Sequence, residues 1–331
     1  MLKVGLVGMG GMGWFHARRY VQLPNVRIAA IADIIPERLE AKEAVQINIA
    51  AGEEAYDFSQ VARYGEGMDL IEQAEVDVVD ICLPTYLHAP YSIAALKAGR
   101  HVLCEKPMAL TPADADLMVT AAEDADRLLM IAQVLRFWPE YRFLAQTIGN
   151  GTYGALRSLN MWRKGGRPLW SPGNWFLDPA LSGGMVLDLH IHDVDFINAT
   201  LGTPDQIYAT GRLSEGAKSY DVVHACFSYE DGPQVHMHAG WSAVQIPFMA
   251  GFEAWFDRAL LVYDRGELQA FVGPERIETS VPEIQSGDGY QEEIAYFLNC
   301  VETGTRPDLC SPRSTRDSLA LIAQELQGIE S

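Results

Sequence analysis

The sequence lacks an excess of positive charge. Its 331 residues include 25 Lys and Arg against 44 Asp and Glu, which gives a formal net charge of −19. A chain of this charge is repelled by nucleic acid and by anionic membrane surfaces, so neither is expected as a partner. The expected partners are small molecules and further copies of the same chain.

Cysteine is scarce, and its spacing fits neither a disulfide framework nor a cysteine zinc site. The five cysteines never form C-x-x-C: Cys82, Cys104, Cys226, Cys300 and Cys310. A reducing cytoplasm fits this pattern. Long apolar runs are missing too, because none approaches the roughly 18 residues of a membrane helix. The first residues resemble a signal peptide, but glycines interrupt the apolar run and no A-x-A cleavage pattern follows.

What the chain does have is a glycine loop between a strand and a helix. Leu2–Val7 is a short apolar run, residues 8–13 read GMGGMG, and a helical pattern extends from Gly11 to Gln22. The second apolar run, Val26–Ala32, ends at Asp33. This order predicts a dinucleotide site in which the loop and the helix start hold the pyrophosphate. The loop residues expected to contact the cofactor are Gly8, Gly10, Gly11, Met12 and Gly13.

The acid that closes the second strand predicts the cofactor. Asp33 would accept hydrogen bonds from the adenosine ribose and repel a 2′-phosphate, so NAD is favoured over NADP. Arg38 is also expected near the ribose and weakens that preference, because an arginine can bind a 2′-phosphate.

Alternation of strand and helix continues to about residue 135. Strands are expected at Val76–Leu83, His101–Cys104 and Leu128–Val134, with helices at His88–Ala98 and Thr111–Ala125. Ligands of doubly wound sheets bind beyond the carboxyl ends of the strands. Further cofactor contacts are therefore expected from the residues after two of these strands: Pro84, Thr85, His88, Glu105 and Lys106. No structure is predicted for Gln46–Met68.

The second half of the chain is predicted to be an α+β domain with a large, mostly antiparallel sheet. Asp231-Gly232 predicts a hairpin turn between two of its strands. The expected strands are Ala155–Arg163, Gln206–Leu213, Asp221–Tyr229, Gln234–Ser242 and Gly251–Tyr263, and the expected helices are Gly184–Leu201, Tyr290–Glu302 and Arg313–Gln327. The domains predicted are residues 1–135 for the nucleotide and 136–331 for substrate binding and oligomerisation.

These motifs resemble the glucose–fructose oxidoreductase, inositol dehydrogenase and rhizopine-catabolism family (Gfo/Idh/MocA) over nearly the whole length. The matching segments are residues 5–13 with His16, then Asp33, 83–88, 101–107, 136–139, 182–195 and 289–307. The resemblance implies a Rossmann domain, NAD or NADP chemistry on a sugar or polyol, and a sheet face that builds a homodimer or homotetramer. It implies that Lys106 is the active-site lysine and that Asp188 and His192 are the acid and the histidine. The chain departs from the family at His190, where members often carry a small residue.

The chemistry of these three side chains suits alcohol oxidation. Histidine has an unperturbed pKa near 6.5, so His192 is a sensible base for the hydroxyl proton. Asp188 lies four residues earlier, on the same helix face, where it would bind substrate or orient the imidazole. Lys106 would hydrogen-bond the reacting oxygen and stabilise a developing alkoxide. A surface Asp–His pair and an unremarkable Lys-Pro remain the alternatives for each motif taken alone.

Other polar residues are assigned with less support. Arg163 and Trp175, with Trp162, flank a Gly/Pro-rich loop and suit a hydroxyl-rich or acidic ligand. His236 and His238 share one face of a strand, so His238 is a candidate substrate contact. A zinc site made by this pair with His190 is the less favoured alternative, and no metal is predicted. Asp195 would orient His192 or cap backbone, and His190 and Asp193 would face the substrate.

The sequence therefore predicts an NAD(P)-dependent oxidoreductase acting on a secondary alcohol or ketone of a sugar, cyclitol or related polyol. A glycoside-cleaving enzyme that uses bound NAD transiently, by oxidation and elimination, stays open as the alternative. A non-catalytic sensor of NAD or sugar is a third class. The sugar, the carbon, the direction of the reaction and the number of subunits are not predicted.

Overall fold

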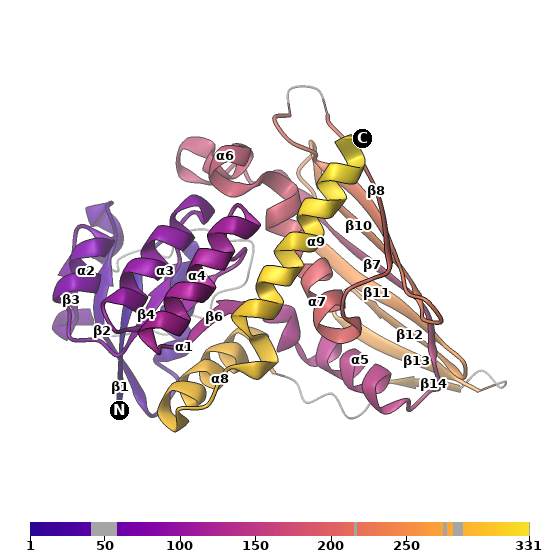
Figure 1. Ribbon diagram of the computed structural model, residues 1–331, viewed down its shortest axis with the longest axis horizontal. Helices are drawn as coiled ribbons and strands as arrows, with labels where there is room; N and C mark the ends of the chain where they lie inside the picture. Colours follow the sequence, from indigo (N-terminus) through magenta and orange to yellow (C-terminus); the bar gives the residue numbers. More distant parts are fainter. Residues whose placement is uncertain (41–57, 215–216, 274–276, 281–286, 331) are drawn as a thin grey trace. The chain divides into compact units, whose positions relative to one another are not determined.

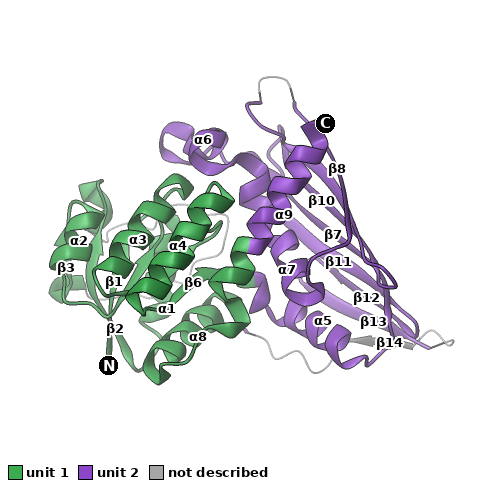
Figure 2. Ribbon diagram, viewed as in Figure 1, with its two compact units in different colours: residues 1–134, 289–316 green, residues 135–288, 317–331 purple. Residues whose placement is uncertain are grey.

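The computed structural model describes residues 1–40, 58–214, 217–273, 277–280 and 287–330 (Figure 1). Contacts divide the chain into two compact units (Figure 2). Unit 1 comprises Met1–Val134 and Gly289–Arg316, and unit 2 comprises Leu135–Asp288 and Asp317–Ser331. The division into a nucleotide-binding domain and a substrate domain after residue 135 remains a prediction. The compact units differ from it in one respect, because Gly289–Arg316 belongs to the unit of the N-terminal sheet.

Unit 1 is built on a six-stranded parallel sheet with the strand order β3-β2-β1-β4-β5-β6. This is the order of a doubly wound dinucleotide-binding sheet, whose direction of winding reverses between β1 and β4. The fold class predicted from the sequence is confirmed. The strands are β1 (Leu2–Val7), β2 (Val26–Ala32), β3 (Ala62–Tyr64), β4 (Val78–Ile81), β5 (His101–Glu105) and β6 (Leu129–Ala132).

Helices cover both faces of this sheet. On one side α2, α3 and α4 lie side by side, and on the other α1 packs against α8, which also contacts β5 and β6. Thr111 caps α4 as expected, because its hydroxyl accepts a hydrogen bond from the Asp114 N–H at 3.1 Å. The helices are α1 (Gly11–Tyr20), α2 (Gly67–Gln73), α3 (His88–Lys97), α4 (Pro112–Ala125) and α8 (Gly289–Thr303). The segment for which no structure was predicted lies partly outside the described residues and otherwise contains β3 and the start of α2.

Unit 2 is built on an eight-stranded sheet with the order β14-β13-β12-β11-β7-β10-β9-β8. All neighbours are antiparallel except β7 and β10, which run parallel at the centre. Asp231 lies in the predicted hairpin turn with a positive φ of 58°. The strands are β7 (Leu156–Gly166), β8 (Gln206–Arg212), β9 (Val222–Ser228), β10 (Gln234–Ser242), β11 (Met249–Phe256), β12 (Ala259–Asp264), β13 (Glu267–Val272) and β14 (Ile277–Ser280).

The β-rich segment predicted at Gly251–Tyr263 contains two strands. The chain turns at Asp257 and Arg258, between β11 and β12. The turn is made by contacts with a distant loop: Asp257 accepts the Ala155 N–H at 2.8 Å, and Arg258 donates to the Thr152 carbonyl at 3.1 Å. Strands β13 and β14 were not predicted at all.

Helices of unit 2 pack on one face of its sheet, except α6 (Pro179–Ser182), which projects away from the strands (Figure 2). An aromatic cluster joins them to the strands, with Tyr141 of α5 edge-to-face against Phe196 of α7 and Phe252 of β11. The helices are α5 (Pro139–Asn150), α6 (Pro179–Ser182), α7 (Ile191–Leu201) and α9 (Pro312–Glu330), and α9 begins in unit 1 and continues into unit 2. In the described residues, no helix has the length and apolarity needed to cross a membrane.

Two buried arginine–aspartate pairs tie α7 to its surroundings. Arg136 donates to both carboxylate oxygens of Asp195, at 2.8 and 2.7 Å, and the Ser318 hydroxyl donates to the same carboxylate at 2.8 Å. Arg163 of β7 donates to Asp193 at 2.8 Å. All four charged side chains are at most 5% exposed. Buried ions need such partners, because an unpaired charge in the interior costs several kcal/mol.

Asp195→Asn is expected to destabilise the protein by about 3 kcal/mol, because it leaves the buried Arg136 guanidinium without its anionic partner. Urea denaturation followed by circular dichroism measures this free energy of unfolding. The matched control is Glu123→Gln, which breaks the exposed pair with Arg313 and should change stability by less than about 1 kcal/mol. Equal losses in both variants would contradict the anchoring role of Asp195.

Candidate functional site

The glycine loop follows β1 at the point where the winding of the sheet reverses. Gly8 has a φ of +93°, and a side chain there would lie 2.5 Å from the Cys82 carbonyl oxygen. A Cβ on Gly13 would lie 1.9 Å from the Gly8 carbonyl oxygen, so α1 approaches the loop as closely as backbone allows. A Cβ on Gly10 would meet only the Arg38 guanidinium, at 3.8 Å. Gly10 therefore leaves space beside the start of α1, where free N–H groups favour a phosphate.

Asp33 lies at the end of β2, next to the same loop. Its carboxylate accepts hydrogen bonds from the Met9 and Ile35 N–H groups, each at 2.8 Å. Arg38 approaches that carboxylate at 3.4 Å and stays 21% exposed. The predicted ribose-binding acid and the arginine thus stand together beside the loop. The open position at Gly10 and the acid at the end of β2 fit a bound dinucleotide.

His88 joins the two other segments predicted to contact the cofactor. It is buried, with Nδ1 2.7 Å from the Pro107 carbonyl oxygen and Nε2 2.8 Å from the Leu83 carbonyl oxygen. Burial lowers the pKa of His88 in spite of these two carbonyls. The neutral ring donates to one carbonyl only. His88 therefore links the loops after β4 and β5 from the interior. The sequence had predicted a cofactor contact for His88 and not this structural role. Pro84 and Lys106, at the ends of the same strands, are part-exposed.

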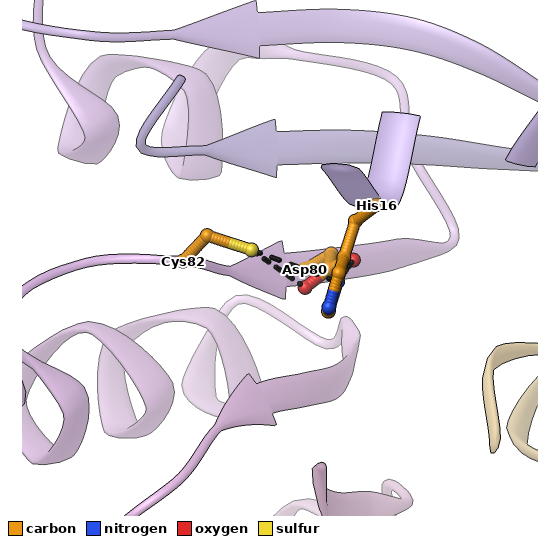
Figure 3. A group of neighbouring side chains, drawn as sticks. All are labelled: His16, Asp80 and Cys82. Atoms are coloured by element: carbon orange, nitrogen blue, oxygen red, sulfur yellow. Dashed lines mark hydrogen bonds and ion pairs between the residues drawn. The ribbon is translucent and has the colours of Figure 1, made fainter. Parts of the chain in front are cut away.

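Behind Lys106 lies a buried polar cluster that the sequence did not reveal (Figure 3). His16 of α1 contacts Asp80 through Nδ1 at 2.8 Å and Glu105 through Nε2 at 3.0 Å. The Cys82 thiol donates to Asp80 at 3.5 Å. Among the described residues, His16, Asp80 and Cys82 form the group whose ligand atoms lie close enough to hold a metal ion. The position of His16, three residues after Gly13 on α1, was the available signal.

In unit 2 the opening segment of the α7 helix carries the predicted acid and histidine. Gly183 and Gly184 have positive φ, and the Ser182 hydroxyl accepts the Gly184 N–H at 2.8 Å. The chain then forms a π-helical turn, Val186–His190, which continues into α7. Such turns are rare and are frequent at functional sites. Of residues 184–197, only Asp188 and His192 are not buried. The fold thus leaves these two side chains part-exposed, one helical turn apart.

The neighbouring polar residues of this segment face inward, so the expectation that they face substrate is wrong. His190 is fully buried and contacts Glu325 of α9 at 2.8 Å. Burial alone would lower its pKa, but the charge of Glu325 and the hydrogen bond to it raise the pKa above the usual value. Asp193 and Asp195 bind Arg163 and Arg136 as described above, so Asp195 neither orients His192 nor caps backbone.

Two of the three predicted substrate contacts, Arg163 and His238, do not lie beside Asp188 and His192. Arg163 is 4% exposed and is bound to Asp193, so it is a buried anchor. His238 pairs in register with Trp162, one residue from Arg163, and therefore faces the side of the sheet opposite to α7. It stacks there on His224, with ring centroids 4.3 Å apart. His190 and the His236/His238 pair thus cannot share a metal ion. Trp175 is part-exposed and stacks on Phe176.

A cavity of about 310 Å³ in unit 2 lies beside the Gly/Pro-rich loop. Its wall includes Ser219, which a side chain on Gly184 would touch, so the cavity neighbours the start of the Asp188 helix. The lining offers several hydroxyl-binding groups and an aromatic ring: Arg167, Asn174, Asp178, Lys218, Asp221 and Trp241. Arg167 and Asn174 lie in the Gly/Pro-rich loop that the sequence indicated as a possible cover for a ligand. The other four were not singled out, because they come from distant segments.

A dinucleotide loop on a doubly wound sheet, together with a second unit that presents an acid and a histidine, defines a nicotinamide-dependent oxidoreductase. Comparison with known proteins agrees. The family model described as the oxidoreductase family with an NAD-binding Rossmann fold matches residues 2–133, and the GFO/IDH/MocA C-terminal domain matches residues 141–257. The chain belongs to the Gfo/Idh/MocA family of NAD(P)-dependent oxidoreductases.

Named relatives support this assignment. Myo-inositol 2-dehydrogenase of Thermotoga maritima is 31% identical over 226 residues, which span 67% of this chain and 62% of that enzyme. The 1,5-anhydro-D-fructose reductase of Ensifer adhaerens is 34% identical over 249 residues, which span 72% and 73% of the two chains. The solved structure of UDP-N-acetylglucosamine 3-dehydrogenase from Acidithiobacillus ferrooxidans has a TM-score of 0.79 and 25% identity, and the match covers 99% of this chain and 97% of that one.

Two glycine substitutions should separate cofactor binding from folding. Gly13→Ala should destabilise the protein by about 1–3 kcal/mol, because its Cβ collides with the Gly8 carbonyl. Gly10→Ala should leave the melting temperature of the cofactor-free protein nearly unchanged. The same variant should weaken NADH binding about tenfold or more, since it fills the space beside the helix start. Thermal unfolding and NADH fluorescence titration measure the two effects, and unchanged NADH affinity in Gly10→Ala would refute the placement of the pyrophosphate.

Proposed function

We propose that the protein oxidises a secondary alcohol of a sugar, cyclitol or related polyol with NAD⁺, or reduces the corresponding ketone. The observation that carries this proposal is that Asp188 and His192 are part-exposed in a segment, residues 184–197, that is otherwise buried. The substrate class is supported by the named relatives, two of which act on a cyclitol and on an anhydro sugar. The polar cavity beside Gly184 suits the same kind of ligand. Trp175, in the Gly/Pro-rich loop beside this cavity, remains a candidate substrate contact.

Each of the three proposed catalytic residues has one task. His192 accepts the hydroxyl proton as the alcohol becomes a ketone, and it returns that proton in reduction. Asp188 binds a substrate hydroxyl or orients the imidazole and stabilises its charged form. Lys106 donates a hydrogen bond to the reacting oxygen, where its positive charge stabilises negative charge as it develops. The bound nicotinamide would take up or supply the hydride.

Binding of the cofactor is assigned to unit 1. Backbone N–H groups at the start of α1 would bind the pyrophosphate, with Gly8, Gly10, Gly11, Met12 and Gly13 shaping the loop. Asp33 would bind the adenosine ribose, which favours NAD over NADP, and Arg38 would stay beside it. The ends of β4 and β5, with Pro84, Thr85, Glu105 and Lys106, would border the nicotinamide half. No metal is assigned a role.

The first experiment follows absorbance at 340 nm with purified protein, NAD⁺ and a panel of polyols, aldoses and cyclitols. The wild type should produce NADH with at least one of them. His192→Ala should lower kcat by about 10²–10⁴-fold because the base is lost. Lys106→Ala should lower it by about 10²–10³-fold because a charged donor to the reacting oxygen is lost.

The matched control is His224→Ala, which removes an exposed histidine from the sheet face opposite to α7 and should keep full activity. Full activity of His192→Ala would show that another group is the base. Release of an aglycone from glycosides without net NADH would favour the alternative, a redox-neutral glycoside-cleaving enzyme. Tight NADH binding with neither activity would favour a sensor.

Cofactor preference gives a separate test. Asp33→Ser should raise kcat/KM with NADP⁺ relative to NAD⁺ by about tenfold or more, because the carboxylate no longer repels the 2′-phosphate and Arg38 stays to bind it. Asp33→Ser combined with Arg38→Ala is the control and should lose most of that gain. Steady-state kinetics with both cofactors decides, and equal preference before and after the first substitution would contradict the ribose-binding role of Asp33.

Assembly and compartment complete the proposal. We infer a homodimer or homotetramer formed through the sheet of unit 2, whose face opposite to α7 carries the exposed Tyr208 and Trp255 and a cavity of about 640 Å³. The cavity is lined by residues of β7, β8, β9 and β10. Free cysteines throughout fit a reducing cytoplasm.

A further inference from the structure

The backbone that carries Lys106 is fixed by the residue before it. Glu105 ends β5 and is 6% exposed. One of its carboxylate oxygens, Oε2, accepts the Lys106 N–H at 3.0 Å, and the other, Oε1, lies 3.0 Å from His16 Nε2. The position of Lys106 therefore depends on a buried carboxylate, and that carboxylate depends on His16.

His16 lies between two acids in the interior of unit 1. Asp80 is 2.8 Å from one ring nitrogen and Glu105 is 3.0 Å from the other, so each carboxylate is best served by an N–H donor. An imidazole donates from both nitrogens only when it is protonated. Both His16 and Asp80 have fully buried side chains, and a buried charge needs a partner at this distance.

The titration of the group follows from this geometry. Burial alone would lower the pKa of His16, but the carboxylate of Asp80, 2.8 Å from the ring, raises it above the usual value. Burial alone would raise the pKa of Glu105, but the neighbouring His16, 3.0 Å away, outweighs it and lowers the pKa.

Other ionisable groups surround the pair on every side. Lys106 and His88 face Glu105 from the loop and from α3, and both favour its charged form. The Cys82 thiol is neutral, since burial raises its pKa. Beyond Asp80 stands Tyr20 of α1, whose pKa is raised by burial and by Asp80, with Glu293 of α8 near it. Among these groups, none supplies a positive charge between Asp80 and Glu105, where His16 lies.

We propose that His16 is a positioning residue of the active site: as a buried imidazolium between Asp80 and Glu105, it keeps Glu105 ionised and directed at the Lys106 backbone. His16 touches neither substrate nor cofactor in this role. The inference rests on the proposed function, in which Lys106 contacts the reacting oxygen. It explains why an acid stands next to Lys106 in the chain and yet points into the interior.

The charge of His16 can be observed without any substrate. In protein labelled with ¹⁵N-histidine, one imidazole should show the resonances of the doubly protonated ring up to at least pH 8, and this signal should vanish in His16→Gln. A His16 ring that loses its proton near pH 6.5, as an exposed histidine does, overturns the proposal. This measurement stands even if the substrate class proposed above is wrong.

Kinetics tests the effect on Lys106. His16→Gln retains an amide donor but no charge, so kcat should fall about ten- to hundredfold while the Kd for NADH changes less than about threefold. Without His16 the pKa of the buried Glu105 rises, so the acid limb of the kcat profile should move to higher pH. Activity at pH 6 should therefore fall more than activity at pH 8. A variant lacking the carboxyl, His16→Gln with Glu105→Gln, should lose this pH shift, and its kcat should match that of the worse single variant.

Cys82→Ala is the matched control, because it removes a side chain from the same cluster without breaking the link from His16 to Glu105. It should keep kcat and the pH profile of the wild type. If Cys82→Ala lowers kcat as much as His16→Gln, with no pH shift in either, the cluster serves packing alone and the proposal fails. One equivalent of zinc in the purified protein, lost in Cys82→Ala, would show that the group binds metal and would also overturn it. An active wild type with a fully active Lys106→Ala would refute the role of Lys106 instead, while the ¹⁵N result for His16 would stand.

Discussion

The placement of Asp188 and His192, the acid and the histidine proposed for catalysis, depends on the burial of neighbouring charges. Asp193 and Asp195 follow His192 directly, and each is held inside by an arginine from another element. Because these aspartates need their guanidinium partners, α7 can lie on the sheet in one rotation only. That rotation turns His190 inward against Glu325 and leaves Asp188 and His192 outside. A segment crowded with polar residues thus divides into an inner set that orients the helix and an outer pair that is part-exposed.

In unit 1, too, some polar residues near the strand ends are part-exposed and others support them from the interior. Gly10, Pro84 and Lys106, which are expected to meet the cofactor, are part-exposed, while His16 and His88 are buried, one against Glu105 and the other against the Pro107 carbonyl. Both histidines lie in segments with strong family character. Residues that mark a family can therefore be supports for the site as well as parts of it.

Local patterns were enough to predict most strands and helices of unit 1, but not β3 or α2. Strands β1 and β2, the glycine loop and the capped α4 each depend on neighbours within a few residues, which a sequence displays directly. Errors arose where a distant partner decides. The break between β11 and β12 is made by residues 152 and 155, about a hundred positions away. The roles of Asp195 and His190 depend on Arg136 and Glu325, which no spacing rule connects to them.

The face of a strand was the other limit. Alternation told us that His236 and His238 share a side of β10, but it could not tell which side the helices cover. Arg163 illustrates the reverse: its place next to Trp162 suggested a ligand-binding arginine, and the register of β7 turned it toward Asp193. Asp188 and His192 were distinguished from their neighbours by resemblance and helical spacing. The π-helical turn beneath them had no sequence signature.

The discontinuity of unit 1 has a consequence for synthesis of the chain. Its sheet is encoded by residue 132, but α8, which covers one face beside α1, begins at Gly289, after the strands of unit 2. Phe15 on α1 meets Tyr290 only when that helix exists, and Cys310 then reaches the Ile131 carbonyl. A ribosome would therefore hold a nucleotide-binding sheet with one side covered only by α1 while it makes more than a hundred further residues. The nascent chain is exposed to misassociation throughout that interval, and a helix made after the strands of unit 2 completes the cover of a sheet made before them.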